Sequence, residues 1–148
     1  MSLEKRLDRD IIEALKAGQK DKLTVLRGLK SALKYARIDK GEDLTDQDVI
    51  TALAAQGKKV RDSIEQFEKG QRSDLVDKAR IELQIIEEYL PEQLDEDKLR
   101  EIIKSAIEEL GAESAKDVGR VMQTVMPRVK GRADGKQVNK LAMEMLAN

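Results

Sequence analysis

The chain has 148 residues, enough for one sizeable core or two small ones, and its 28 basic and 29 acidic side chains leave a net charge of −1. It contains no cysteine and no histidine, which excludes disulfides, thiolate nucleophiles, zinc fingers and every catalytic arrangement built on an imidazole base. Charged residues make up 39% of the chain and aromatic residues 2%, a composition typical of helices with solvated charged faces.

The sequence also bears on the compartment of the protein. No apolar run approaches the length needed to cross a bilayer, so no membrane segment is predicted. The first residues enter an amphipathic pattern directly, without the apolar segment of a secretory signal peptide. We therefore expect a cytoplasmic protein.

Two amphipathic helices are predicted in the first quarter of the chain. Ser2 is the expected N-cap of the first helix and Gly18 its end. The apolar face of this helix consists of Leu3, Leu7, Ile11 and Leu15. The second helix begins near Asp21 and stops before the polar turn at 39–43. Its predicted buried residues are Leu23, Leu26, Leu29, Leu33 and Ala36.

Two further helices follow before a proline-containing hinge. Thr45 is the predicted N-cap of the third helix, with Asp48 at the position that completes a capping box. Its apolar residues are Ile50, Leu53, Gly57, Val60, Ile64 and Phe67. Gly70 ends that helix and Ser73 is expected to cap the fourth, whose apolar residues are Val76, Ala79, Leu83, Ile86 and Leu90. The matching seams predict an all-α, four-helix bundle-like domain over residues 1–92.

A smaller three-helix domain is predicted over residues 93–148. Pro91 disfavours helical geometry at the residue before it, and Asp95 is the expected N-cap of the next helix, which Gly111 ends. The apolar residues of this helix are Leu99, Ile102, Ile103, Ala106, Ile107 and Leu110.

The two last helices are separated by a glycine-containing turn. Ser114 with Asp117 is expected to start the first of them, which carries Val118, Val121, Met122 and Val125. Pro127 should kink or break this helix near Met126. Asp134 is the predicted cap of the last helix, whose buried residues are Val138, Leu141 and either Met145 or Leu146.

The most informative feature of the chain is a concentration of positive charge near its C-terminal end. Residues 116–140 carry seven basic side chains against two acidic ones, a net charge of +5 on a chain that sums to −1. Residues 95–113 carry a net charge of −4. Such a local excess of cations favours an anionic partner. The basic residues are Lys116, Arg120, Arg128, Lys130, Arg132, Lys136 and Lys140.

The turn between the last two helices is the strongest candidate for phosphate binding. Lys130, Arg132 and Lys136 surround it, and Gly131 and Gly135 are expected to shape it. Arginine can hold a phosphate bidentately and lysine contributes a point charge. The capping carboxylate occupies some N–H donors of the following helix, so the side chains are better candidate ligands than the helix end.

The alternative interpretation is purely structural. In it, Gly131 is a helix C-cap, Gly135 lies in a first helical turn, and the cations form an ordinary solvated face. The spacing differs from a phosphate-binding P-loop, which requires a preceding strand and a hydroxyl after the lysine. The sequence predicts no catalytic residue, no metal site and no cofactor.

Four segments in this order resemble the YqeY family of small bacterial proteins, over essentially the whole chain. They are Asp21–Arg27, Glu88–Leu94, Gly119–Met122 and Met126–Gly135. The resemblance implies an N-terminal helical bundle joined to a smaller C-terminal three-helix unit.

The C-terminal part also resembles the tail domain of GatB, a subunit of the tRNA-dependent amidotransferase. That tail helps to hold the outer body of tRNA, whereas the chemistry occurs in another domain that nothing in this chain resembles. A carbon–nitrogen ligase label, with glutamine as amido-N-donor, is therefore implied by the tail resemblance only. Carried over to this chain, the tail's role falls on Arg120, Lys130, Arg132 and Lys136.

Two hypotheses for the function follow. The first is a non-catalytic module that binds tRNA or another structured RNA through its backbone, because residues 93–148 contain no aromatic side chain on which bases could stack. The second is a protein adaptor that docks on an aminoacyl-tRNA synthetase or an amidotransferase, with the apolar hinge around Tyr89 and Leu94 as its contact.

Overall fold

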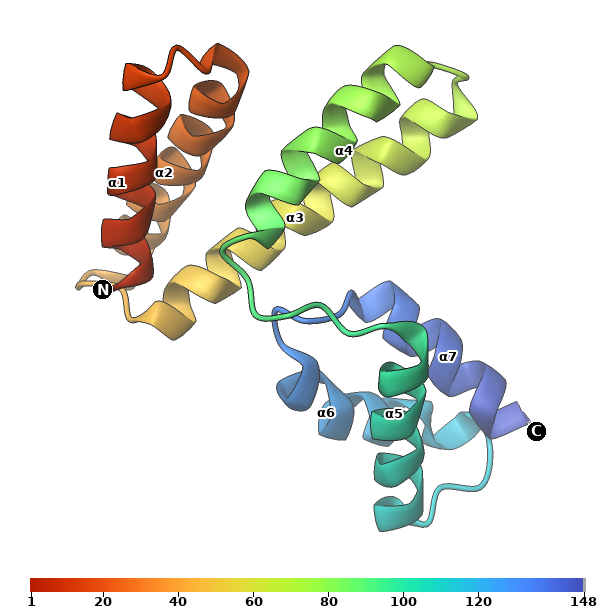
Figure 1. The fold of residues 1–148 in the computed structure, drawn as a ribbon. Coiled ribbons are helices and arrows are strands. Elements are labelled where there is room, and N and C mark those ends of the chain that lie inside the picture. Colours follow the sequence, from red (N-terminus) through yellow and green to blue (C-terminus); the bar gives the residue numbers. More distant parts are fainter. Residues whose placement is uncertain (148) are drawn as a thin grey trace. The chain divides into compact units, whose positions relative to one another are not determined.

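The computed structural model describes residues 1–147. These residues form seven α-helices, one short 3-10 helix and no strand, so the prediction of an all-α protein is confirmed (Figure 1). They divide into two compact units, which we call unit 1 (residues 1–91) and unit 2 (from Glu92 onward). Each unit has its own hydrophobic core.

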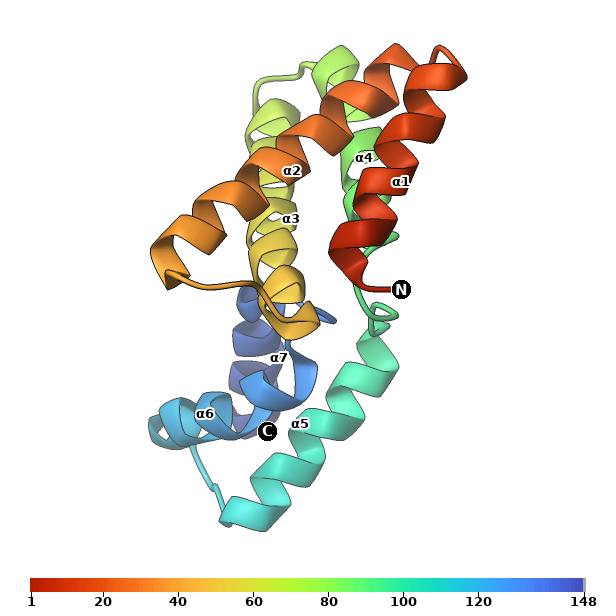
Figure 2. The ribbon, with the colours of Figure 1, turned by 90° about the vertical axis from the view of Figure 1, so that its left-hand side faces the viewer.

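Unit 1 consists of two helical hairpins. Helices α1 (Leu3–Lys16) and α2 (Lys20–Lys40) form the first, and α3 (Asp46–Lys69) and α4 (Ser73–Glu87) form the second (Figures 1 and 2). Helix α2 joins them, because it packs against both helices of the second hairpin. The fully buried core side chains of unit 1 include Leu7, Leu26, Leu33, Val49, Leu53 and Ile86.

Local hydrogen bonds start α1 and α3 where the sequence predicts. The Ser2 hydroxyl accepts a hydrogen bond from the backbone N–H of Lys5, which starts α1. Thr45 and Asp48 form the reciprocal capping box of α3. The Lys40 ammonium also binds the Asp48 carboxylate, and these hydrogen bonds lower the pKa of Asp48 to about 2.

Three details of unit 1 differ from the sequence-based prediction. Leu15 is 58% exposed, and its neighbour Ala14 is buried in its place because that side of α1 faces the core. Ser73 is the first residue of α4 and not its N-cap. Arg72 occupies the N-cap position, and it makes no side-chain capping bond. Helix α4 ends at Glu87, so Leu90 packs on the core from outside the helix.

Unit 2 packs three helices against one another. They are α5 (Glu96–Leu110), α6 (Val118–Val129) and α7 (Gly135–Ala147), with the short 3-10 helix η1 (Ala115–Asp117) before α6. The Asp95 carboxylate accepts a hydrogen bond from the backbone of Lys98 at 2.8 Å, and Gly111 ends α5 at a positive φ of 64°, as predicted. The buried core side chains of unit 2 include Leu99, Ile103, Val121, Val125, Val138 and Leu141.

Helix α6 differs from its prediction at both ends. It begins after η1, and Ser114 makes no side-chain capping bond. The predicted break near Met126 is wrong, because α6 continues through Pro127 to Val129. Val125 and Val129 lie one turn apart and are both fully buried, so core packing stabilises the turn that contains the proline. Proline lacks an amide donor, but only the last turn of α6 is affected.

Among residues 1–147, no helix combines the length and the apolar character needed to span a membrane.

Candidate nucleic-acid interface

The turn between α6 and α7 is shaped by a glycine in the left-handed region. Gly131 has a φ of 75°, a conformation that costs other residues about 1–2 kcal/mol. The backbone N–H groups of Arg132 and Ala133 donate to the carbonyl of Val129 at 2.8 and 3.1 Å and close the turn. Gly135 is the first residue of α7, and a Cβ there would make only an ordinary 3.6 Å contact with Met126. The geometry of the turn therefore requires glycine at position 131 and not at 135.

The same turn is hydrogen-bonded to the first residues of unit 2. The Gln93 side-chain amide donates to the carbonyl of Gly131 at 2.7 Å, and the Leu94 backbone N–H donates to the carbonyl of Arg132 at 2.9 Å. The Arg132 guanidinium donates in turn to the carbonyl of Glu92 at 3.3 Å. The sequence predicts residues 92–94 only as part of a hinge. The carbonyl groups of a turn need hydrogen-bond donors, and this requirement is the only signal that could have indicated the role of residues 92–94.

Four predicted cations lie on this turn and the start of α7, and we call them the turn cations: Lys130, Arg132, Lys136 and Lys140. Lys136 and Lys140 are four residues apart and so share one side of α7. Arg132 is half-buried, whereas the three lysines are exposed. The Asp134 carboxylate accepts a hydrogen bond from the backbone of Lys136 at 3.3 Å, so it takes up a donor of the helix end as predicted.

The other three predicted cations lie on η1 and α6, and one of them, Arg128, is in the last turn of α6, two residues before Lys130. Lys116 is in η1 and Arg120 is in the first turn of α6. Ten residues of helix and turn separate Arg120 from Lys130, about 15 Å along a helix axis. The structure therefore divides the predicted surface into the turn cations and a second group at the other end of α6.

Two of the arginines are paired with carboxylates. Arg120 contacts Asp117 at 3.2 Å and Arg128 contacts Glu109 on α5 at 2.6 Å. The Arg128 guanidinium lowers the pKa of Glu109, and a hydrogen bond from the backbone N–H of Glu113 lowers the pKa of Asp117. Both arginines remain exposed, but part of their charge is neutralised locally.

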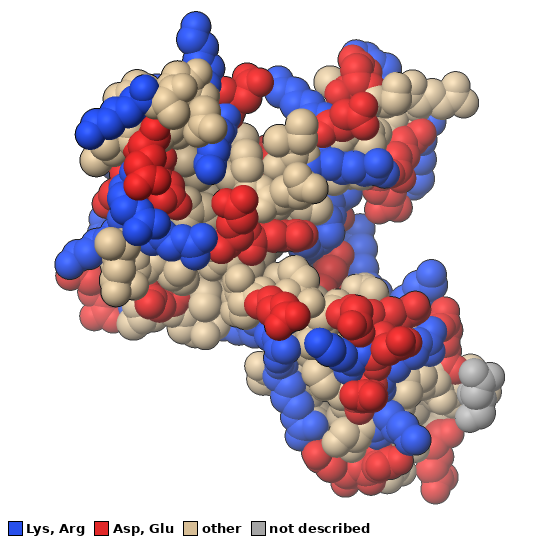
Figure 3. Space-filling view, in the orientation of Figure 1, with Lys and Arg blue, Asp and Glu red and all other residues tan. Residues whose placement is uncertain are grey.

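Three of the predicted lysines have no ion-pair partner among residues 1–147: Lys116, Lys130 and Lys140. Cations and carboxylates alternate over the face drawn in Figure 3, and no uniformly positive patch covers it. Any attraction for a polyanion on that face depends on local groups of lysine and arginine rather than on a broad field. Within the described residues, no group of three or more acidic side chains could hold a metal ion.

The hinge residue Tyr89, expected as a docking contact, belongs to the core of unit 1. Its ring is 3% exposed, its hydroxyl donates to the Asp10 carboxylate, and the Arg6 guanidinium lies 4.6 Å from the ring centre. Burial, reinforced by the neighbouring Asp10, raises the pKa of the Tyr89 hydroxyl. Tyr89 is therefore a structural residue that a partner cannot reach in this conformation.

Comparison with known proteins gives consistent matches. The family model described as Yqey-like protein matches residues 4–146. A protein of Pyrenophora tritici-repentis named "Altered inheritance of mitochondria protein 41, mitochondrial" is 31% identical over 144 residues, covering 95% of this chain and 79% of that protein. A protein of the same name from Lachancea thermotolerans is 40% identical over 88 residues, covering 57% of this chain and 46% of that protein. An uncharacterised protein of Schizosaccharomyces pombe is 32% identical over 91 residues, covering 62% of this chain and 74% of that protein.

These names correct one prediction. The sequence was expected to be that of a cytoplasmic protein, but two of these relatives are named as mitochondrial, which contradicts it. The error has a physical reason. Receptors read organelle targeting signals, whereas composition and helix periodicity reflect folding and are the same in either compartment.

The matched region covers most of both units and overlaps all seven helices of residues 1–147. It includes residues of both hydrophobic cores. The chain belongs to the YqeY family.

Proposed function

We propose that unit 2 binds the sugar–phosphate backbone of tRNA or another structured RNA through the turn cations. The observation that carries this proposal is that the turn's backbone is hydrogen-bonded to residues 92–94 of the same unit. A turn held in this way presents its cations without a large loss of conformational entropy on binding. This preorganisation distinguishes it from a mobile run of basic residues.

The chemistry of the surface favours phosphate over bases as the binding target. Lysine and arginine contacts to phosphate fix the position of a nucleic acid without reading its sequence. Unit 2 contains no aromatic residue, so bases have no ring on which to stack. The proposed ligand is consequently recognised by the shape of its backbone.

The second group of cations supports an extended ligand. Arg120 lies about 15 Å from Lys130 along α6, a distance that a single phosphate cannot bridge, and Lys116 precedes it in η1. Residues 95–113 carry the opposite charge and would repel an RNA that approached from their side. Together these features favour one orientation of a folded RNA on unit 2.

The test uses two double variants with the same change of charge. Lys130→Glu/Lys140→Glu reverses two exposed turn cations, and Lys98→Glu/Lys104→Glu reverses two exposed lysines on α5. Affinity for total tRNA and for duplex DNA is measured over a salt series. We expect the first variant to bind tRNA at least about tenfold more weakly and to show a salt slope shallower by about 1.4–1.8, from two lost phosphate contacts. The α5 variant should lose clearly less affinity for tRNA than the turn variant.

Equal losses in the two variants would show that only net charge matters and would contradict the proposed surface. Equal affinity for tRNA and duplex DNA would contradict recognition of a folded RNA. Association with an aminoacyl-tRNA synthetase or amidotransferase that is insensitive to salt would favour the adaptor function instead.

A further inference from the structure

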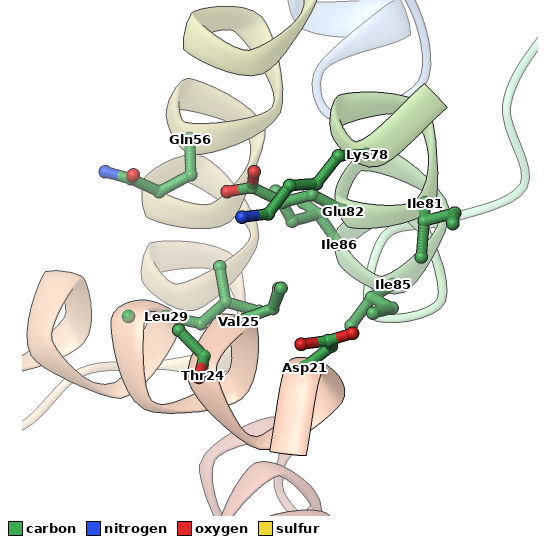
Figure 4. A pocket seen from close by; sticks show the side chains of 11 residues that line it. Asp21, Thr24, Val25, Leu29, Gln56, Lys78, Ile81, Glu82, Ile85 and Ile86 are labelled. Carbon is green, nitrogen blue, oxygen red and sulfur yellow. The ribbon is translucent and has the colours of Figure 1, made fainter. Parts of the chain in front are cut away.

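Unit 1 contains a groove of about 640 Å³ between α2, α3 and α4 (Figure 4). Its floor is apolar and includes the buried side chains of Leu29, Ile85 and Ile86. Ile81 lines the groove from α4 and is 58% exposed. Water in this groove therefore contacts apolar surface that a partner could cover.

Gly28 lies in the wall of this groove and has no structural explanation within unit 1. It is in the middle of α2, where glycine costs about 1 kcal/mol relative to alanine. A Cβ at Gly28 would meet nothing within 4 Å. By contrast, a Cβ at the buried Gly57 of α3 would lie 3.7 Å from the side chains of Leu83 and Ile86, so helix packing explains that glycine. Gly28 instead lowers the groove wall and lets another backbone approach closely.

The rim of the groove carries charges without partners. Asp21, Lys78 and Glu82 line it, and none of them forms an ion pair with any of residues 1–147. Lys78 and Glu82 are one turn apart on α4, yet they do not pair. Arg80, which is also on α4, does pair, with Glu68 of α3 at 3.0 Å. The rim thus offers one cation and two carboxylates to a ligand of complementary charge.

The geometry points to an α-helix as the ligand. An added β-strand requires a sheet edge, and the described part of the chain contains no strand. A polyproline segment requires a groove lined by aromatic rings, and no aromatic side chain lines this one. A second copy whose two-fold axis passes through the groove would place the same concave surface opposite itself and leave the floor uncovered.

We propose that this groove binds an amphipathic α-helix of a partner protein. Its apolar stripe covers the floor of the groove and Ile81, and a small residue in that stripe crosses α2 at Gly28. Basic side chains on one flank face Asp21 and Glu82, and an acidic side chain faces Lys78. The residues involved all lie in unit 1, so the inference is independent of RNA binding by unit 2.

The probe is a helical peptide of about 18 residues, long enough to exceed the roughly 12 Å that Asp21 to Leu29 span along α2. It carries leucines at alternating three- and four-residue spacings, one alanine in the middle of that stripe, and arginines and a glutamate on the flanks. A second peptide has its flanking charges exchanged. Fluorescence anisotropy with the full chain should show binding of the first peptide and at least fivefold weaker binding of the second.

Two glycine variants make the test specific. Gly28→Leu fills the groove while leucine remains compatible with the helical backbone, so the melting temperature should not fall. We expect it to weaken peptide binding at least tenfold. Gly119→Leu is the matched control, because its Cβ on α6 also meets nothing within 4 Å but lies in unit 2. It should leave binding unchanged.

Equal binding by Gly28→Leu and the unchanged protein would overturn the proposal, and so would failure of both peptides to bind. A dimer of the chain that Gly28→Leu abolishes would also overturn it, because the occupant would then be a second copy. Lys78→Glu gives an independent measure. It should reduce or reverse the preference between the two peptides.

Discussion

The α6–α7 turn and the α2–α4 groove are both formed by packed helices, but the side chains they expose differ: the first exposes charged groups and the second apolar ones. In unit 2, three helices pack against one another, and the polar features protrude at a turn. In unit 1, two hairpins joined through α2 leave an apolar concavity with charges only at its rim. Helix packing therefore leaves exposed lysines at a turn in one unit and an apolar groove in the other. The partners proposed for them differ accordingly, a polyanion for the turn and an amphipathic helix for the groove.

The largest expected effect concerns the separate cores of the two units. Leu53→Ala in unit 1 and Ile103→Ala in unit 2 each remove a fully buried side chain and should cost about 2–5 kcal/mol. Native-state hydrogen exchange should show faster exchange confined to the mutated unit. Spread of the effect to both units in either variant would contradict independent cores.

Gly131→Ala should destabilise unit 2 by about 1–2 kcal/mol, because alanine is strained at a φ of 75°. Urea unfolding of the variant measures this loss, and its affinity for tRNA should fall as the turn distorts. Gly135→Ala is the control. Its Cβ would make an ordinary contact in the first turn of α7, so its stability should be unchanged or slightly higher.

Gln93→Ala removes the hydrogen bond to the carbonyl of Gly131 and should cost about 0.5–1.5 kcal/mol. The turn cations themselves are retained. A severalfold fall in tRNA affinity with an unchanged salt slope would indicate that Gln93 positions the turn. Unchanged affinity would mean that the turn keeps its shape without this bond.

The smallest effect is a pH dependence confined to unit 1. Hydrogen bonds from Lys40 and Thr45 lower the pKa of Asp48 from 3.8 to about 2, so the charged form stabilises the fold. This contribution is present above pH 4 and should be lost as the pH falls toward 2. Asp48→Asn should flatten the stability profile in that window. Asp39→Asn is the control, because this carboxylate has no ion pair among residues 1–147. This variant should keep the pH dependence of stability seen in the unchanged protein.

Much of the fold could be predicted because its determinants are local. The caps at Ser2, Thr45 and Asp95 depend on residues three positions apart, and periodic leucines identify the buried face of α2. The failures arise where packing overrides a local preference. Pro127 remains helical because Val129 is buried one turn after Val125.

The candidate site was predicted only in part. The turn cations follow from the sequence because a few neighbouring residues bring them together. The bond from Gln93 to Gly131 joins residues 38 positions apart, and no pattern in the chain indicates it. The separation of Arg120 from the turn likewise depends on the continuation of α6 through Pro127, which the sequence did not predict.

By itself, the sequence determined the helices, most of their ends and the location of the positive charge, since these depend on contacts within one or two helical turns. Only the tertiary structure decided that Arg128 pairs with Glu109, what holds the α6–α7 turn, and that Gly28 opens onto a groove. Those features depend on contacts between helices distant in sequence. Helical periodicity specifies which face of a helix is buried, but it does not specify the helix against which that face packs.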